Sequence, residues 1–178
     1  MVSRAVFLDR DGTLAPDVPY CSRPEDFEVF ADAPEALALL KSHGFRLIVV
    51  TNQSGVARGY FTETTLAEIH RKMARLLAER GAEIDAVYYC PHHPDDGCLC
   101  RKPGTVLFLR AAVEHNIDLI GSFVVGDSAI DIEAGRAVGC RTVLVTTGPR
   151  HGGGVTVLPH FAADSLLEAA GWIVEQPD

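Results

Sequence analysis

Near its N-terminus the chain reads Ala5-Val6-Phe7-Leu8-Asp9-Arg10-Asp11-Gly12-Thr13-Leu14. Four apolar residues in a row predict a short strand that is buried on both faces, as strands of parallel sheets are. The apolar run ends in two aspartates spaced by one residue. Asp-Gly after a strand can be a simple polar turn. Acidic groups at more than one strand end instead favour a ligand site at the carboxyl edge of the sheet.

The rest of the chain alternates apolar strands with amphipathic helices. Further strands are predicted at residues 45–50, 86–89, 122–127 and 141–145. Helices are predicted to begin at Asp32, at Thr62 or Thr65, near Thr105, after Asp127, and at Asp164 or Ser165. We therefore expect one α/β domain over residues 1–178, with a doubly wound, Rossmann-like parallel sheet. Residues 12–31 and 90–102 are both too short for a cap domain, and Gly152-Gly153-Gly154 predicts a mobile loop.

Composition narrows the possible partners. The net charge of −8 argues against a nucleic-acid binder, which would need a basic face. No apolar run approaches the roughly 20 residues of a membrane span, and the N-terminus shows no signal-peptide pattern. We expect a cytoplasmic monomer without nucleic-acid or membrane partners.

Four potential metal ligands lie within eleven residues: Cys90, His92, Cys98 and Cys100. A Cys3His set is typical of closed, tetrahedral, structural Zn²⁺ sites, and reduced thiols suit the cytosol better than a disulfide framework does. His93 is an alternative ligand because it is adjacent to His92. The zinc-bound loop would position Arg101 and Lys102, which follow it directly.

The aspartates point to a second metal. Residues i and i+2 of an extended segment face the same way, so Asp9 and Asp11 are expected to direct their carboxylates to one place. A divalent cation would relieve their repulsion. Asp127, at the end of a later strand, could supply another oxygen ligand, and Asp131 a further oxygen at or beside the metal. Several carboxylates in one site favour Mg²⁺.

At this point the chain resembles the haloacid dehalogenase (HAD) superfamily of phosphohydrolases. Phe7 to Leu14 matches the first motif of that family, and Val49-Val50-Thr51-Asn52 matches the second. Lys102 fits the third motif, and Gly126-Asp127 with Asp131 fits the fourth. The four matches are in family order.

The resemblance implies a mechanism. Asp9 would be the nucleophile and form an aspartyl-phosphate. Asp11 would be the general acid for the leaving alcohol and then the base for water, and its backbone carbonyl would bind Mg²⁺. Thr51 and Lys102 would hold the phosphoryl oxygens, and Lys102 with Mg²⁺ would neutralise the charge that opposes attack by a carboxylate.

Two segments resemble one smaller group within this superfamily. Residues 88–103, which carry the cysteine cluster, and residues 51–63 resemble the group that contains the D-glycero-D-manno-heptose 1,7-bisphosphate 7-phosphatases and the histidinol-phosphatases. The heptose enzymes are the better match, which implies removal of the 7-phosphate from a small phosphorylated sugar. Candidate substrate contacts are Asp17, Tyr20, Asn52, Gln53, Ser54, Arg58, Arg101 and Ser128.

Two alternatives stay open. Ser128 stands where the heptose enzymes usually have a lysine, and the five-residue gap between His92 and Cys98 resembles the histidinol-phosphatase loop. A non-catalytic, zinc-stabilised binding module would be expected to lack part of the catalytic set, yet Asp9, Asp11, Thr51, Lys102 and Asp127 are all present. His70 and His115 fall in predicted helices and are expected at the surface.

Overall fold

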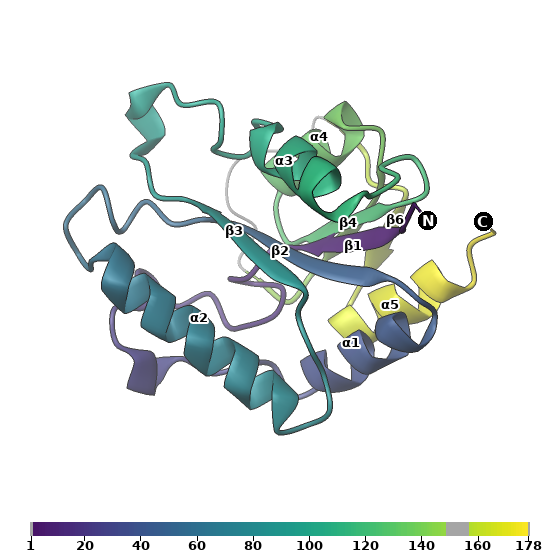
Figure 1. The fold of residues 1–178 in the computed structure, drawn as a ribbon, viewed down its shortest axis with the longest axis horizontal. Helices are drawn as coiled ribbons and strands as arrows, with labels where there is room; N and C mark the ends of the chain where they lie inside the picture. The colour runs from purple at the N-terminus through teal and green to yellow at the C-terminus, as the bar shows by residue number, and fades with distance from the viewer. Residues whose placement is uncertain (1, 149–156, 178) are drawn as a thin grey trace.

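Six parallel strands form the central sheet of the computed structural model, which describes residues 2–148 and 157–177 (Figure 1). The order of the strands is β3-β2-β1-β4-β5-β6. Their bounds are β1 Ala5–Leu8, β2 Arg46–Asn52, β3 Ala86–Cys90, β4 Phe123–Gly126, β5 Arg141–Val145 and β6 Phe161–Ala163. The predicted doubly wound parallel sheet is confirmed.

Helices cover both faces of this sheet (Figure 1). One face packs on α1, α2 and α5, and the other packs on α3 and α4. The bounds are α1 Ala33–Ser42, α2 Glu63–Ala78, α3 Val106–His115, α4 Ala129–Ala137 and α5 Leu166–Val174. Two short 3₁₀ turns, Pro24–Asp26 and Pro94–Asp96, lie in the loops after β1 and β3.

The apolar run at the start of the chain is explained by the place of β1 in the middle of the sheet. Successive side chains of a strand point to opposite faces. Val6 and Leu8 enter the core shared with α1 and α5, and Ala5 and Phe7 enter the core shared with α3. All four residues are fully buried, so both faces of the strand have to be apolar.

Two expectations about the elements need correction or completion. The sequence predicted five strands and missed β6, which has only three residues and pairs with β5 at the sheet edge. Its three apolar residues gave no clear signal, because a segment this short cannot be told from a loop by its pattern. Of the two candidate caps of α2, Thr62 is the N-cap, since its hydroxyl accepts a hydrogen bond from the Thr65 amide. The predicted glycine loop at residues 152–154 lies outside the described residues.

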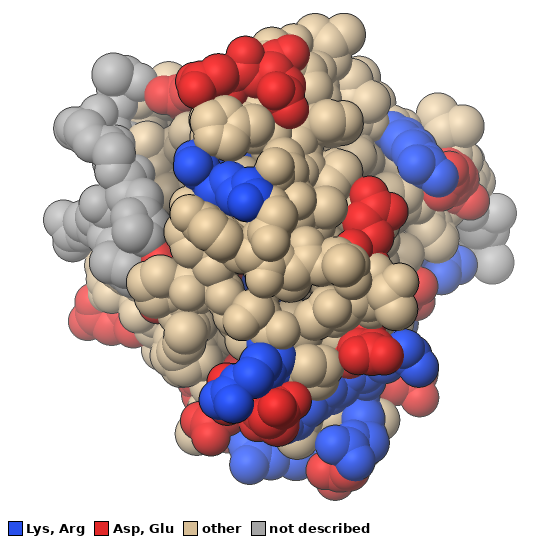
Figure 2. Space-filling view, turned by 90° about the vertical axis from the view of Figure 1, so that its left-hand side faces the viewer, with Lys and Arg blue, Asp and Glu red and all other residues tan. Residues whose placement is uncertain are grey.

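The order of the strands determines where a ligand can bind. The chain moves outward from β1 through β2 to β3, then returns to pair β4 with the other side of β1. Crevices form at such reversal points, at the carboxyl ends of the strands. This edge lies at the left of Figure 1 and faces the viewer in Figure 2, where much of the middle of the face is uncharged. Among the described residues no helix is both long and apolar enough for a membrane crossing.

Candidate active site

Four segments bring their polar residues together at this edge. Asp9 follows β1, and its amide donates a hydrogen bond to the carbonyl of Val125 in β4. Thr51 ends the buried part of β2. Asp127 follows β4, and Lys102 comes from the loop between β3 and α3. Segments far apart in the sequence therefore meet at one place, as the predicted site requires.

Three carboxylates form the acidic part of the site. One oxygen atom from each of Asp9, Asp127 and Asp131 lies within 4.8 Å of the other two. Burial raises the pKa of Asp9 to about 7, although Lys102 opposes this shift. Burial, helped by the charge of Asp131, also raises the pKa of Asp127 to about 7. The protein environment alone therefore disfavours ionisation of both groups, and a bound cation would reverse that.

Lys102 supplies the positive charge that the site itself contains. Its Nζ lies 2.9 Å from Oδ1 of Asp9 and 2.7 Å from Oδ1 of Asp131, and it donates a 2.7 Å hydrogen bond to the carbonyl of Val50. Burial would lower the pKa of Lys102, but Asp131 and Asp9 outweigh it and raise the pKa above its usual range. All three N–H groups of the ammonium are used, so it holds the carboxylate of Asp9 in place.

The surroundings of Asp127 fit a metal. Its Oδ2 is buried and has no hydrogen-bond partner among the described residues. A Cβ atom at Gly12 or at Gly148 would overlap this carboxylate, and Gly12 also has a φ of +79°. A buried oxygen without a partner is costly. Mg²⁺ prefers carboxylate and carbonyl oxygens, so the oxygens gathered here suit that ion.

Asp131 is less available to a metal than its place in the cluster suggests. Its Oδ1 pairs with Lys102. Its Oδ2 accepts hydrogen bonds from the amide of Ser128 at 3.2 Å and from the Ser128 hydroxyl at 2.5 Å. Asp131 therefore holds Lys102 and the start of α4. Ser128, a candidate substrate contact, uses its hydroxyl proton on this carboxylate instead.

Asp11 does not point where the spacing rule predicted. Its carboxylate turns away from the cluster of Asp9, Asp127 and Asp131 and binds Arg10 and Gln53. The i, i+2 rule fails because β1 ends at Leu8 and the chain then enters a turn, in which Leu14 and Ala15 donate to the carbonyl of Arg10. Only the backbone carbonyl of Asp11 remains as a candidate metal ligand, as the family resemblance implied.

The last residue of β2 and the residue after it position two parts of the site. Gln53 is 5% exposed and donates from Nε2 to Oδ2 of Asp11 and to Oγ1 of Thr51, each at 2.8 Å. The side chain of Asn52 accepts from the amide of Lys102 at 3.0 Å and donates to its carbonyl at 3.2 Å. Both residues were predicted as substrate contacts. In the structure their side chains hold Asp11 and the loop of Lys102.

A pocket of about 230 Å³ opens beside Asp11 and Arg10. Its walls include five of the predicted substrate contacts: Asp17, Tyr20, Asn52, Gln53 and Ser54. Arg58 is exposed and lies 5.8 Å from the ring centroid of Tyr20, at the rim. The structure thus brings the loops after β1 and β2 around one cavity next to the acidic cluster.

Arg101 lies outside that pocket. The guanidinium is half-buried, and its Nη1 is buried without a hydrogen-bond partner among the described residues. Such a donor is available to an anion. Its role as a phosphate contact stays a prediction.

The cysteine loop has the geometry of a tetrahedral metal site. Sγ of Cys90 lies 3.5 Å from Sγ of Cys98 and 3.2 Å from Sγ of Cys100, and Nδ1 of His92 lies 3.2 Å from the Cys100 sulfur. Zinc–sulfur bonds of about 2.3 Å place tetrahedral ligands at roughly such separations. Burial raises the pKa of Cys90 to about 12, so the free thiol would stay protonated and a metal would have to displace its proton. His93 is directed elsewhere, to the amide of Asp95.

Sequence reasoning missed two residues that complete the site. Arg10 is 2% exposed and binds Asp11, Gln53 and His70. His70 was expected at the surface, but it is half-buried and contacts Arg10. A signal existed: His70 lies four residues after Leu66, at the border of the buried face of α2.

Comparisons with known proteins agree with this geometry. Residues 99–169 match the family model of HAD-hydrolase-like proteins. The chain is 46% identical, over 76% of its length and 93% of the relative, to a probable D-glycero-D-manno-heptose-1,7-bisphosphate 7-phosphatase of Thermoplasma volcanium. It is 42% identical to the D-glycero-beta-D-manno-heptose-1,7-bisphosphate 7-phosphatase of Yersinia pestis, over 93% of the chain and 90% of the relative.

A solved structure is also similar. The D,D-heptose 1,7-bisphosphate phosphatase of B. bronchiseptica, crystallised with magnesium and phosphate, superposes with a TM-score of 0.88 at 36% identity. The match covers 98% of this chain and 99% of that one.

Proposed function

The chain belongs to the HAD-like hydrolases, in the family of D-glycero-D-manno-heptose-1,7-bisphosphate 7-phosphatases, and on that premise we propose that it removes the 7-phosphate of this heptose bisphosphate with the help of Mg²⁺. It is a phosphoric monoester hydrolase, as its named relatives are. The observation that carries the proposal is the contact of Lys102 with both Asp9 and Asp131, beside the unpartnered Oδ2 of Asp127.

The chemistry follows from these side chains. A carboxylate oxygen of Asp9 attacks the phosphorus, the bond to the sugar oxygen breaks, and Asp11 gives its proton to that oxygen. Asp11 then takes a proton from water, which attacks the aspartyl-phosphate and releases inorganic phosphate and Asp9. Lys102 orients Asp9, and Thr51 offers a hydroxyl to a phosphoryl oxygen. These roles are supported by the geometry of the three strand ends and of the loop that carries Lys102.

Two metals complete the proposal. Asp9, Asp127 and the backbone carbonyl of Asp11 would hold Mg²⁺, which supplies charge neutralisation for the attack of one anion on another. Cys90, His92, Cys98 and Cys100 would hold a structural Zn²⁺. Reduced thiols in such a site are typical of the cytoplasm, where we place the enzyme.

The substrate can be tested by direct comparison. We expect kcat/KM with Mg²⁺ to be highest on heptose 1,7-bisphosphate, and at least about 10-fold lower on histidinol phosphate and fructose 1,6-bisphosphate, because pocket contacts made only by the right substrate are worth that much. The relatives favour the heptose over histidinol phosphate, the alternative that Ser128 and the short cysteine loop left open. A preference for histidinol phosphate would reject the heptose assignment but keep the phosphatase.

A further inference from the structure

Arg10 is a buried cation with no role in the mechanism described so far. Its Nε donates to Oδ1 of Asp11 at 3.0 Å, and its Nη2 donates to Oδ2 at 2.9 Å. A planar guanidinium that meets a carboxylate through two parallel bonds fixes the plane and direction of that carboxylate. The orientation of Asp11 therefore depends on the orientation of Arg10.

Arg10 is itself held on its other sides. Nη2 also donates to Oε1 of Gln53 at 3.0 Å, and Nη1 lies 3.3 Å from Nε2 of His70. The ring of Phe27 packs on the guanidinium, with its centroid 5.5 Å from Cζ. These contacts come from three separate segments of the chain, so the guanidinium has one well-defined position.

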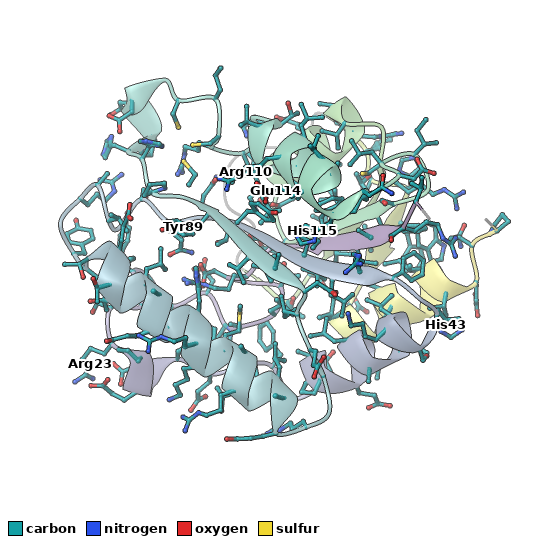
Figure 3. The ribbon with its side chains drawn as sticks, viewed as in Figure 1. Arg23, His43, Tyr89, Arg110, Glu114 and His115 are labelled. Carbon is teal, nitrogen blue, oxygen red and sulfur yellow. The ribbon has the colours of Figure 1, made fainter. Side chains whose placement is uncertain are left out.

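His70 is the contact that comes from a helix. It projects from α2, and its ring centroid lies 5.8 Å from that of Tyr89. Tyr89 lies on the side of β3 that faces α2 (Figure 3). Burial, together with the charge of Arg10, lowers the pKa of His70 to about 4. The imidazole is therefore neutral near pH 7, and Nε2 can accept the Nη1–H hydrogen bond in the tautomer that carries its proton on Nδ1.

The hydrogen bonds of Asp11 distinguish its two oxygens. Among the described residues, Oδ2 accepts two hydrogen bonds, from Nη2 of Arg10 and from Nε2 of Gln53, whereas Oδ1 accepts one from Nε of Arg10. A carboxylate oxygen has about two lone-pair sites, so Oδ1 keeps one site for a proton. The side chain of Asp11 is 23% exposed and lines the pocket, so its carboxylate can meet a ligand bound there.

We propose that His70, acting through Arg10, holds the carboxylate of Asp11 so that Oδ1 is the atom that delivers the proton to the leaving oxygen. His70 is a positioning residue, because it touches Arg10 and not the reacting atoms. The inference rests on the proposed function and adds a residue of α2 to it. In the step concerned, the Asp11 O–H bond breaks and its proton binds the leaving oxygen as the phosphorus–oxygen bond breaks.

The leaving group provides a sharp test. A sugar alkoxide needs a proton donor to leave, whereas 4-nitrophenolate leaves without one. The value of kcat/KM reports the steps up to and including the departure of this leaving group. With His70→Phe we expect kcat/KM on heptose bisphosphate to fall about 10- to 100-fold, a large part of the usual worth of general acid catalysis. On 4-nitrophenyl phosphate the same variant should stay within about 2-fold of the original, since that step needs no acid.

Three further variants complete the test. His70→Gln can present an amide oxygen near the place of Nε2 and should restore most of the lost kcat/KM. His115→Phe is the matched control, because His115 is a half-buried histidine of α3 that packs on Tyr88, and α3 covers the face of the sheet opposite α2 (Figure 3). This variant should behave as the original on both substrates. His70→Leu replaces the phenylalanine variant if that one does not fold, as judged by its thermal unfolding.

The outcomes separate the two proposals. An equal fall on both substrates, or no fall on either in a folded variant, would overturn the role of His70. An original enzyme that cleaves neither substrate would overturn the proposed function instead.

Discussion

Lys102 determines the charge balance at the centre of the site. It is 3% exposed and pairs with Asp9 and Asp131. Removing one partner from a buried ionic group leaves uncompensated charge and typically costs about 3–5 kcal/mol. We expect Lys102→Met to lower the free energy of unfolding by about that amount, measured by urea denaturation.

A lysine at a more exposed pair is the control for Lys102. Nζ of Lys41 lies 2.6 Å from Asp85, but the Lys41 side chain is one-third exposed. Exposed pairs are screened by solvent, so Lys41→Met should cost about 1 kcal/mol or less. Equal losses in the two variants would contradict the view that burial sets the importance of Lys102.

The nucleophile can be tested with a nearly isosteric change. Asp9→Asn keeps the shape of the side chain but removes the charge and the nucleophilic oxygen. We expect turnover at the background level on every phosphate ester, because no aspartyl-phosphate can form. The circular dichroism spectrum and the zinc content should be those of the original protein. Normal turnover in this variant would show that Asp9 is not the nucleophile.

Among the individual elements, we expect the cysteine loop to link metal binding to catalysis. Cys100 precedes Lys102 by two residues, and Asn52 binds the Lys102 backbone from β2. We expect about one zinc per chain, and Cys98→Ser should lose that zinc. This variant should also lower kcat/KM by about 10-fold or more, because mutating residues that hold the groups of a site in place commonly lowers activity by that factor. Metal analysis and kinetics on the same sample would check this.

Cys140→Ser is the matched control for the loop. Cys140 is 2% exposed and lies just before β5, outside the cluster. The Cys140→Ser variant should keep its zinc even if its stability falls. A folded, fully active protein without zinc would show that the loop needs no metal.

For the molecule as a whole, the crowded carboxylates link stability to pH, and we expect them to link it to Mg²⁺ as well. Burial raises the pKa of Asp9 and of Asp127 from 3.8 to about 7. The folded protein therefore binds more protons than the unfolded chain between about pH 4 and pH 7. Without metal, these two groups make the fold less stable as the pH rises through that window, and their effect is constant above it.

Bound Mg²⁺ would replace those protons, so we expect its effect on stability to depend on pH. We expect Mg²⁺ to raise the unfolding temperature by a few degrees at about pH 8 and by much less at about pH 5.5, where protons compete for the ligands. Differential scanning calorimetry with and without Mg²⁺ would measure both shifts. Asp127→Asn should lose most of the effect. A shift of equal size at both pH values would exclude proton competition.

The parallel sheet and the order of its helices were predictable from the amino-acid sequence, because strands such as β1 have to be apolar on both faces and this leaves a plain pattern. The four candidate zinc ligands and the aspartates at two strand ends were predictable as well, since those residue types and spacings have few other uses. The three-residue β6 was missed, because pairing with β5 rather than its own pattern makes it a strand.

The partners of the polar side chains, in contrast, became clear only from the packing of the folded chain. The turn after β1 sends the carboxylate of Asp11 to Arg10, and the packing of α2 brings His70 to the same guanidinium. Gln53 and Ser128 were predicted to contact the substrate, but their side chains form hydrogen bonds with other residues of the site. The direction of a side chain depends on neighbours distant in the sequence, and local spacing does not contain that information.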